Sequence, residues 1–84
     1  MGDYKFSDHA YYMLKERKIS EEWLEMTIDA PEITESDAAG NLHLIRSIKE
    51  FGGRFLRVVV NPNTEPVTVV TLFFDRRLGG KHEA

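Results

Sequence analysis

Hydrophobic residues in the first third of the chain recur at helical spacing. Between residues 7 and 17 they fall on one side of a helical wheel, and Ser7 stands ahead of them as an N-cap. A second such segment begins at Ser20 and ends before Pro31, which disfavours helix at the residue ahead of it. The pattern therefore predicts two amphipathic helices, over 7–17 and 20–30.

After the second helix the pattern changes to that of strands. Residues 42–49 alternate between apolar and polar, while 54–61 and 67–75 are rich in β-branched and aromatic residues. Because the last two segments are apolar on both faces, we expect central strands covered on two sides. The polar segment 32–37 fits either an edge strand or a loop, and 76–84 fits a flexible tail. The predicted fold class is α+β, with two N-terminal helices followed by a three- to four-stranded antiparallel sheet.

Length and composition fit one soluble domain. The chain has 84 residues, of which 42% are hydrophobic and 30% charged, and no apolar run approaches the roughly 20 residues of a membrane helix. The absence of cysteine excludes disulfides and thiol chemistry, and it favours a cytoplasmic protein. The three histidines are scattered, so we expect neither a metal site nor a cofactor.

Charge is distributed unevenly along the chain. The net charge is −3, yet residues 19–45 hold seven acidic residues and no Lys or Arg, while residues 46–81 are basic. A domain that is acidic overall can therefore present a basic surface to a partner. The alternative is a set of solvated charges with no partner.

The first helix carries two residues that could take part in chemistry. On the wheel, Arg17 falls at the centre of the apolar side and His9 at its edge. His9 could serve as a general acid or base, or it could be a boundary histidine bonded to backbone. Arg17 could bind a substrate, or it could bond the last carbonyls of its own helix or a strand carboxylate.

Polar residues also interrupt the apolar faces of the strands. Arg46 shares a face with Leu44, Arg57 shares one with Phe55, and Thr71 shares one with Val69 and Phe73. Arginines rising from a sheet face suit the binding of phosphate, because the guanidinium fork matches its geometry. The alternative places both arginines on a solvated face. Two further cations, Arg76 and Arg77 at the exit of the last strand, could contact nucleic acid or could be a solvated terminus only.

Several of these segments resemble an uncharacterised bacterial family of short proteins. The resemblance spans nearly the whole chain and rests on the blocks Phe6-Ser7-x-His9-Ala10, Glu16-Arg17-x-Ile19-Ser20, Gly53-Arg54-x-Leu56-Arg57, Val69-Val70-Thr71 and Asp75-Arg76-Arg77. The family it resembles is grouped with the RelE/ParE-like toxins, within the barnase–EndoU–colicin–RelE fold. This implies a single domain over 1–84 with a helical hairpin and an antiparallel sheet whose concave face carries the site.

The resemblance also implies an activity. Members of the wider fold are metal-independent ribonucleases or toxins paired with an antitoxin, which makes RNA and an antitoxin protein the expected partners. Carried onto this chain, His9 would transfer the proton, Arg57 and Thr71 would face the phosphate, and Arg17 would orient the substrate or stabilise charge. Arg46, which stands out from the strand pattern alone, is a further expected substrate contact.

Two hypotheses from different classes follow. The first is a toxin-like endoribonuclease that uses His9, Arg57 and Thr71. The second is a non-catalytic interaction module, a degenerate toxin fold that docks an antitoxin or a second copy through the edge strand 32–37.

Overall fold

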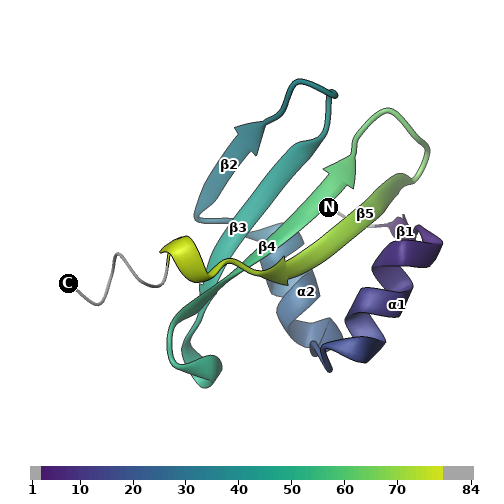
Figure 1. Cartoon of the computed structure of the whole chain (residues 1–84). Coiled ribbons are helices and arrows are strands. Elements are labelled where there is room, and N and C mark those ends of the chain that lie inside the picture. The colour runs from purple at the N-terminus through teal and green to yellow at the C-terminus, as the bar shows by residue number, and fades with distance from the viewer. Residues whose placement is uncertain (1–2, 79–84) are drawn as a thin grey trace.

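The structure is a computed structural model that describes residues 3–78. It consists of a five-stranded sheet with two α-helices packed on one face (Figure 1). The strands lie in the order β1-β5-β4-β3-β2. Along the chain the elements are β1 (Tyr4–Phe6), α1 (Asp8–Glu16), α2 (Glu21–Asp29), β2 (Ile33–Ser36), β3 (Leu42–Ile48), the 3₁₀ turn η1 (Lys49–Phe51), β4 (Arg54–Asn61) and β5 (Val67–Phe74).

The α+β class is confirmed, but the sheet differs from the expected one. It has five strands rather than three or four, and it is mixed because β1 pairs in parallel with β5. The sequence did not predict β1, because three residues are too few to show alternation. The segment 32–37 does contain an edge strand, since β2 pairs only with β3.

Both helices begin where the sequence places their caps. The Ser7 hydroxyl accepts a hydrogen bond from the Ala10 amide, and the Ser20 hydroxyl accepts one from the Glu22 amide. The expected position of Arg17 is wrong, because α1 ends at Glu16 and Arg17 is its C-cap with an exposed side chain. The wheel angle therefore no longer predicts the direction of that side chain. None of the helices in residues 3–78 is long and apolar enough to cross a membrane.

The helices cover one face of the sheet only. Their buried residues pack with the strand side chains of that face into one core: Ala10, Leu14, Leu24, Ile28, Leu44, Ile48, Leu56, Val58, Val60, Val69 and Leu72. The alternate side chains of β3, β4 and β5 point to the opposite side, which we call the open face. The expectation that the last two strands are covered on two sides by other elements is therefore wrong for residues 3–78, although Ile45, Phe55 and Val59 on the open face are buried.

A bulge in β5 changes which residues share a face. Val60 pairs with Val69 while Val59 pairs with Thr71, so Val70 is an extra residue between two registers. Val69 consequently lies in the helix-side core, whereas Thr71 lies on the open face. The expected grouping of Thr71 with Val69 is wrong for this reason, and its grouping with Phe73 holds.

Ser7 ties the start of α1 to this bulge, and its loss is expected to destabilise the fold by about 2 kcal/mol. Besides capping Ala10, its hydroxyl donates to the Val70 carbonyl oxygen at 2.9 Å. Ser20→Ala is the matched control, because Ser20 only caps its helix, and it should cost about 1 kcal/mol. Urea unfolding of the two variants measures the difference. Equal losses would show that the bond to Val70 contributes nothing.

Candidate functional site

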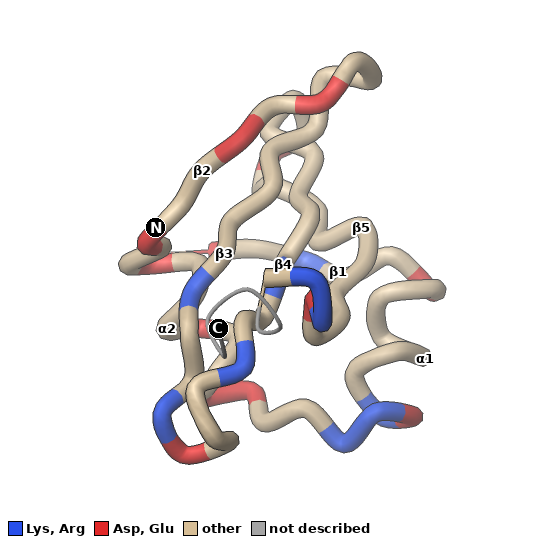
Figure 2. The backbone as a smooth tube through the Cα atoms, turned by 60° about the vertical axis from the view of Figure 1, so that its left-hand side comes forward, with Lys and Arg blue, Asp and Glu red and all other residues tan. Residues whose placement is uncertain are grey.

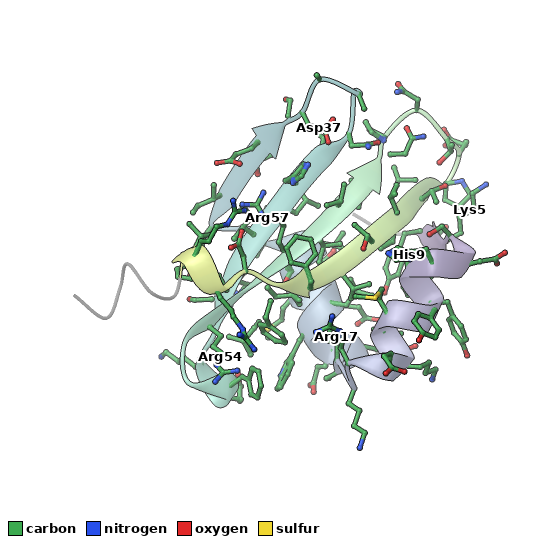
Figure 3. The ribbon with its side chains drawn as sticks, viewed as in Figure 1. Lys5, His9, Arg17, Asp37, Arg54 and Arg57 are labelled. Carbon is green, nitrogen blue, oxygen red and sulfur yellow. The ribbon has the colours of Figure 1, made fainter. Side chains whose placement is uncertain are left out.

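A chain of polar side chains crosses the open face, with Arg57 on β4 at its centre (Figure 3). The Arg57 Nε donates to Oδ2 of Asp75 at 2.9 Å, and its Nη2 lies 2.9 Å from the same oxygen. Its Nη1 lies 2.8 Å from Nδ1 of His43 and 3.5 Å from a carboxylate oxygen of Glu35. These contacts reach Arg57 from β2, from β3 and from the end of β5.

The register of the strands explains why these residues meet. Arg57 pairs directly with Ile45 and Phe73, and His43 pairs with Val59, so His43 and Arg57 are diagonal neighbours on one face. Asp75 follows β5, and its backbone amide donates to the Phe55 carbonyl at 2.8 Å. That bond continues the β4–β5 pairing and turns the Asp75 carboxylate back over the open face.

The two neighbours of His43 fix the tautomer of its ring. A guanidinium can only donate, so Nδ1 of His43 accepts the hydrogen bond from Arg57. Its Nε2 lies 2.8 Å from Oδ2 of Asp37, which accepts the remaining ring proton. The unprotonated nitrogen of His43 is therefore the one that faces Arg57, and the carboxylate behind it orients the ring.

Both aspartates at the ends of this chain are held ionised. The hydrogen bond from Arg77 is the largest cause that lowers the pKa of Asp75, and the guanidinium of Arg57 adds to it against the opposing effect of burial. The hydrogen bond with His43 is the largest cause that lowers the pKa of Asp37, with backbone amides of Asn41 and Ala39 contributing. Each carboxylate thus remains an acceptor over the whole neutral range.

The charge of Arg57 is largely neutralised by its neighbours. Its side chain is 11% exposed, and it faces the buried Asp75 carboxylate and the 58%-exposed Glu35 carboxylate. Arg77 sits on the far side of Asp75, with its Nε 3.2 Å from Oδ1, and its side chain is 82% exposed. An anion that reaches this face meets Arg77 first and must compete with carboxylates for Arg57.

The structure gathers some of the sequence-predicted site residues and separates others. Arg57 and Arg77 meet through Asp75, and Thr71 lies on the same face opposite Val59. His9 is exposed on the first turn of α1, across β5 from Arg57 in Figure 3. No hydrogen bond or ion pair joins His9 to Arg57 within residues 3–78.

The remaining predicted cations lie away from this network. Arg46 is on the helix side of β3, where its Nη1 donates to the Ala30 carbonyl at 2.8 Å, at the C-terminal end of α2. That placement stabilises the helix end. Arg17 is exposed at the end of α1, and Arg76 is exposed beside Arg77, where residues 76–78 have helical backbone. The rest of the tail expected over 76–84 lies outside the described residues.

Sequence reasoning missed four members of the network. The sequence pattern assigns no role at the site to His43, Glu35, Asp37 or Asp75. The alternation along residues 42–49 does place His43 on the face of the strand opposite to Leu42 and Leu44. The signal that was lacking is the strand register, which brings His43 diagonal to Arg57. Within residues 3–78 no three His, Asp or Glu side chains come together in a way that could hold a metal ion.

These features define an α+β domain with a covered and an open sheet face, the open one carrying a His–Arg–Asp network. The chain belongs to the family described as "Domain of unknown function (DUF4258)", whose model matches residues 6–74. No curated protein matches the chain, and no solved structure does.

Proposed function

We propose that this protein is a metal-independent endoribonuclease of the toxin type, acting on single-stranded RNA at the open face. The observation that carries the proposal is the position of His43 between Asp37 and Arg57. It provides a carboxylate-oriented imidazole whose unprotonated nitrogen adjoins a guanidinium. A base beside a phosphate-binding cation is the minimum that RNA cleavage through the 2′-hydroxyl requires.

In the proposed reaction, an RNA phosphate first meets Arg77 and then takes over the Nη1 hydrogen bonds of Arg57. That exchange releases Nδ1 of His43 from Arg57, so Nδ1 can accept the proton of the neighbouring 2′-hydroxyl. The 2′-oxygen attacks phosphorus, the bond to the 5′-oxygen breaks, and the leaving oxygen takes a proton from a water molecule, which recovers a proton from the His43 imidazolium. The products are a 2′,3′-cyclic phosphate and a 5′-hydroxyl end.

Each neighbour of His43 has a role in this scheme. Asp37 holds the ring and stabilises the imidazolium that forms, while Arg57 and Arg77 stabilise the charge that develops on the phosphate. Thr71, on the same face, would donate to a phosphate oxygen. His9 remains the alternative proton-transfer residue, at the rim beyond β5.

The test is incubation of purified protein with a single-stranded RNA in the presence of EDTA. We expect internal cleavage that leaves 2′,3′-cyclic phosphate ends, and no cleavage of the DNA of the same sequence, because DNA lacks the 2′-hydroxyl. Intact RNA at every concentration tried, together with normal growth of cells expressing the protein, would contradict the proposal.

A second candidate function is favoured by the edge strand β2. All four of its residues are exposed. The Asp37 amide donates to the Asn41 carbonyl, and hydrogen-bonded residues alternate along an antiparallel strand, so the backbone N–H and C=O groups of Thr34 and Ser36 point away from the sheet. β2 lies in the segment without Lys or Arg, so it would pair with a basic extended segment of a partner such as an antitoxin, and less well with its own acidic copy. Light scattering distinguishes a monomer from the edge-to-edge homodimer.

A further inference from the structure

An aromatic cluster with one exposed member, Phe51, lies at the end of the sheet that carries η1. Phe51 of η1 packs against Phe74 of β5, with ring centroids 4.8 Å apart, and against Trp23 of α2 at 5.5 Å. Phe51 is 39% exposed, although it is one of the largest apolar side chains. The cluster is separate from the Arg57 network, because Trp23 and Phe74 belong to the helix side of the sheet.

An arginine lies over the exposed member of this cluster. The guanidinium carbon of Arg54 is 4.8 Å from the centroid of the Phe51 ring, which is the geometry of a cation–π contact. Arg54 is exposed and has no carboxylate partner within residues 3–78, in contrast to Arg57. Its charge is therefore available to a ligand while its plane extends the aromatic surface.

The backbone holds this surface in place. Gly52 and Gly53 follow Phe51 with φ of +71° and +77°, values that side-chain-bearing residues rarely adopt. Their amides bond the carbonyls of Lys49 and Ile48, at 3.2 and 2.9 Å. The turn is thus closed by hydrogen bonds, which hold Phe51 in its position beside Trp23 and Phe74.

The charges around the cluster indicate which ligand suits it. Lys49 and Arg54 flank Phe51 in the chain and are exposed, and Figure 3 shows Arg17 at the same end of the molecule as Arg54. Figure 2 shows blue segments at this end with red ones among them, since the exposed Glu50 lies between Lys49 and Phe51, whereas β2 and the turn after it carry only acidic charges. An apolar protein partner would leave these cations unpaired, but a polyanion with flat rings satisfies both features.

We propose that Phe51, Arg54 and Trp23 form a stacking site for an unpaired base of single-stranded nucleic acid. Lys49 and Arg17 then contact the flanking phosphates. The proposal deepens the proposed function and rests on it, because it supplies a second contact for the same RNA at the end of the strand that carries Arg57. Arg54 and Arg57 are three residues apart on β4, about 10 Å along an extended strand, and their side chains point to opposite faces, so one RNA that contacts both must pass round the end of the sheet.

Trp23 makes the test direct, because it is the only tryptophan of the chain. Its fluorescence is followed while the intact protein is titrated with a single-stranded oligodeoxynucleotide, which the proposed reaction cannot cleave. An oligomer of the same length made of abasic residues carries the phosphates without the bases. We expect quenching by the first and at least tenfold weaker binding of the second.

Phe51→Leu and Arg54→Gln are expected to weaken binding of the base-containing oligomer by roughly 5- to 100-fold. The matched control is Tyr12→Leu, which removes a 60%-exposed aromatic side chain on α1 and should leave binding unchanged. Equal binding of the abasic oligomer, no quenching at all, or an equal loss in the Tyr12 variant would overturn the stacking site. Cleavage of RNA without quenching would overturn only the stacking site, while quenching without cleavage would overturn only the ribonuclease.

Discussion

The Asp75→Ala variant is expected to unfold at a temperature roughly 12–24 °C below that of the wild-type protein. Its carboxylate is 2% exposed and holds two guanidinium groups, those of Arg57 and Arg77. Removal of one partner from a buried ion pair typically costs 3–5 kcal/mol, because the other charge stays buried without it. Glu35 and His43 still contact Arg57, so we expect about 3 kcal/mol, and a domain of this size loses about 4–8 °C per kcal/mol.

A double variant separates the loss of the pair from the loss of packing. Arg57→Met with Asp75→Leu replaces both charges by apolar groups, and such replacements are often neutral or stabilising. We expect it to recover most of the stability that Asp75→Ala loses in thermal unfolding followed by circular dichroism. If Asp75→Ala unfolds within a few degrees of the wild-type protein, the ion pair does not stabilise the fold.

The same carboxylate makes the fold sensitive to acid. Arg77 and Arg57 lower the pKa of Asp75 in the folded protein. The ionised Asp75 carboxylate therefore contributes its full share to the free energy of unfolding above the ordinary aspartate pKa. This stabilisation is lost as the pH falls through the lowered pKa that Asp75 has in the folded protein. Stability of the wild-type protein should therefore fall more steeply below about pH 4 than that of Asp75→Ala.

His43→Ala is expected to reduce the RNA cleavage rate by about 10²- to 10⁴-fold, the usual contribution of a general base. The rate is measured under single-turnover conditions with EDTA present, so that neither product release nor a metal ion contributes to the measured rate. His9→Ala is the matched control, since it removes an exposed imidazole from outside the network and should retain the wild-type rate. The opposite result, with His9→Ala inactive and His43→Ala active, would assign the proton transfer to His9.

Much of the fold could be predicted from the sequence, because it depends on local signals. Ser7 and Ser20 precede their helices as caps, and the apolar runs of residues 54–61 and 67–75 lie in the strands β4 and β5. β1 could not be predicted, since its existence depends on a parallel pairing with residues more than sixty positions away. The orientation of the Arg17 side chain depends on whether α1 ends at Glu16 or one residue later, and the sequence does not fix a helix end that closely.

The candidate site was predictable only in part. Arg57 and Arg77 were identified because charges in or beside apolar strands stand out in a sequence. His43 and Asp75 do not stand out, and their importance comes from the register of β3 on β4 and from the extension of the pairing beyond β5. The bulge at Val70 likewise moved Thr71 away from the face of Val69, and no residue type in that segment signals it.

The most direct test of the central claim is to locate the RNA phosphate on the protein. In a nitrogen-15 NMR titration with a 2′-O-methyl oligoribonucleotide, which cannot be cleaved through its 2′-oxygen, side-chain resonances report each candidate group. We predict that Nη1 of Arg57 and Nδ1 of His43 shift together as the hydrogen bond between these two atoms is exchanged, while the ring of His9 does not shift. Movement of His9 with no change at Arg57 and His43 would place the RNA elsewhere and contradict the account.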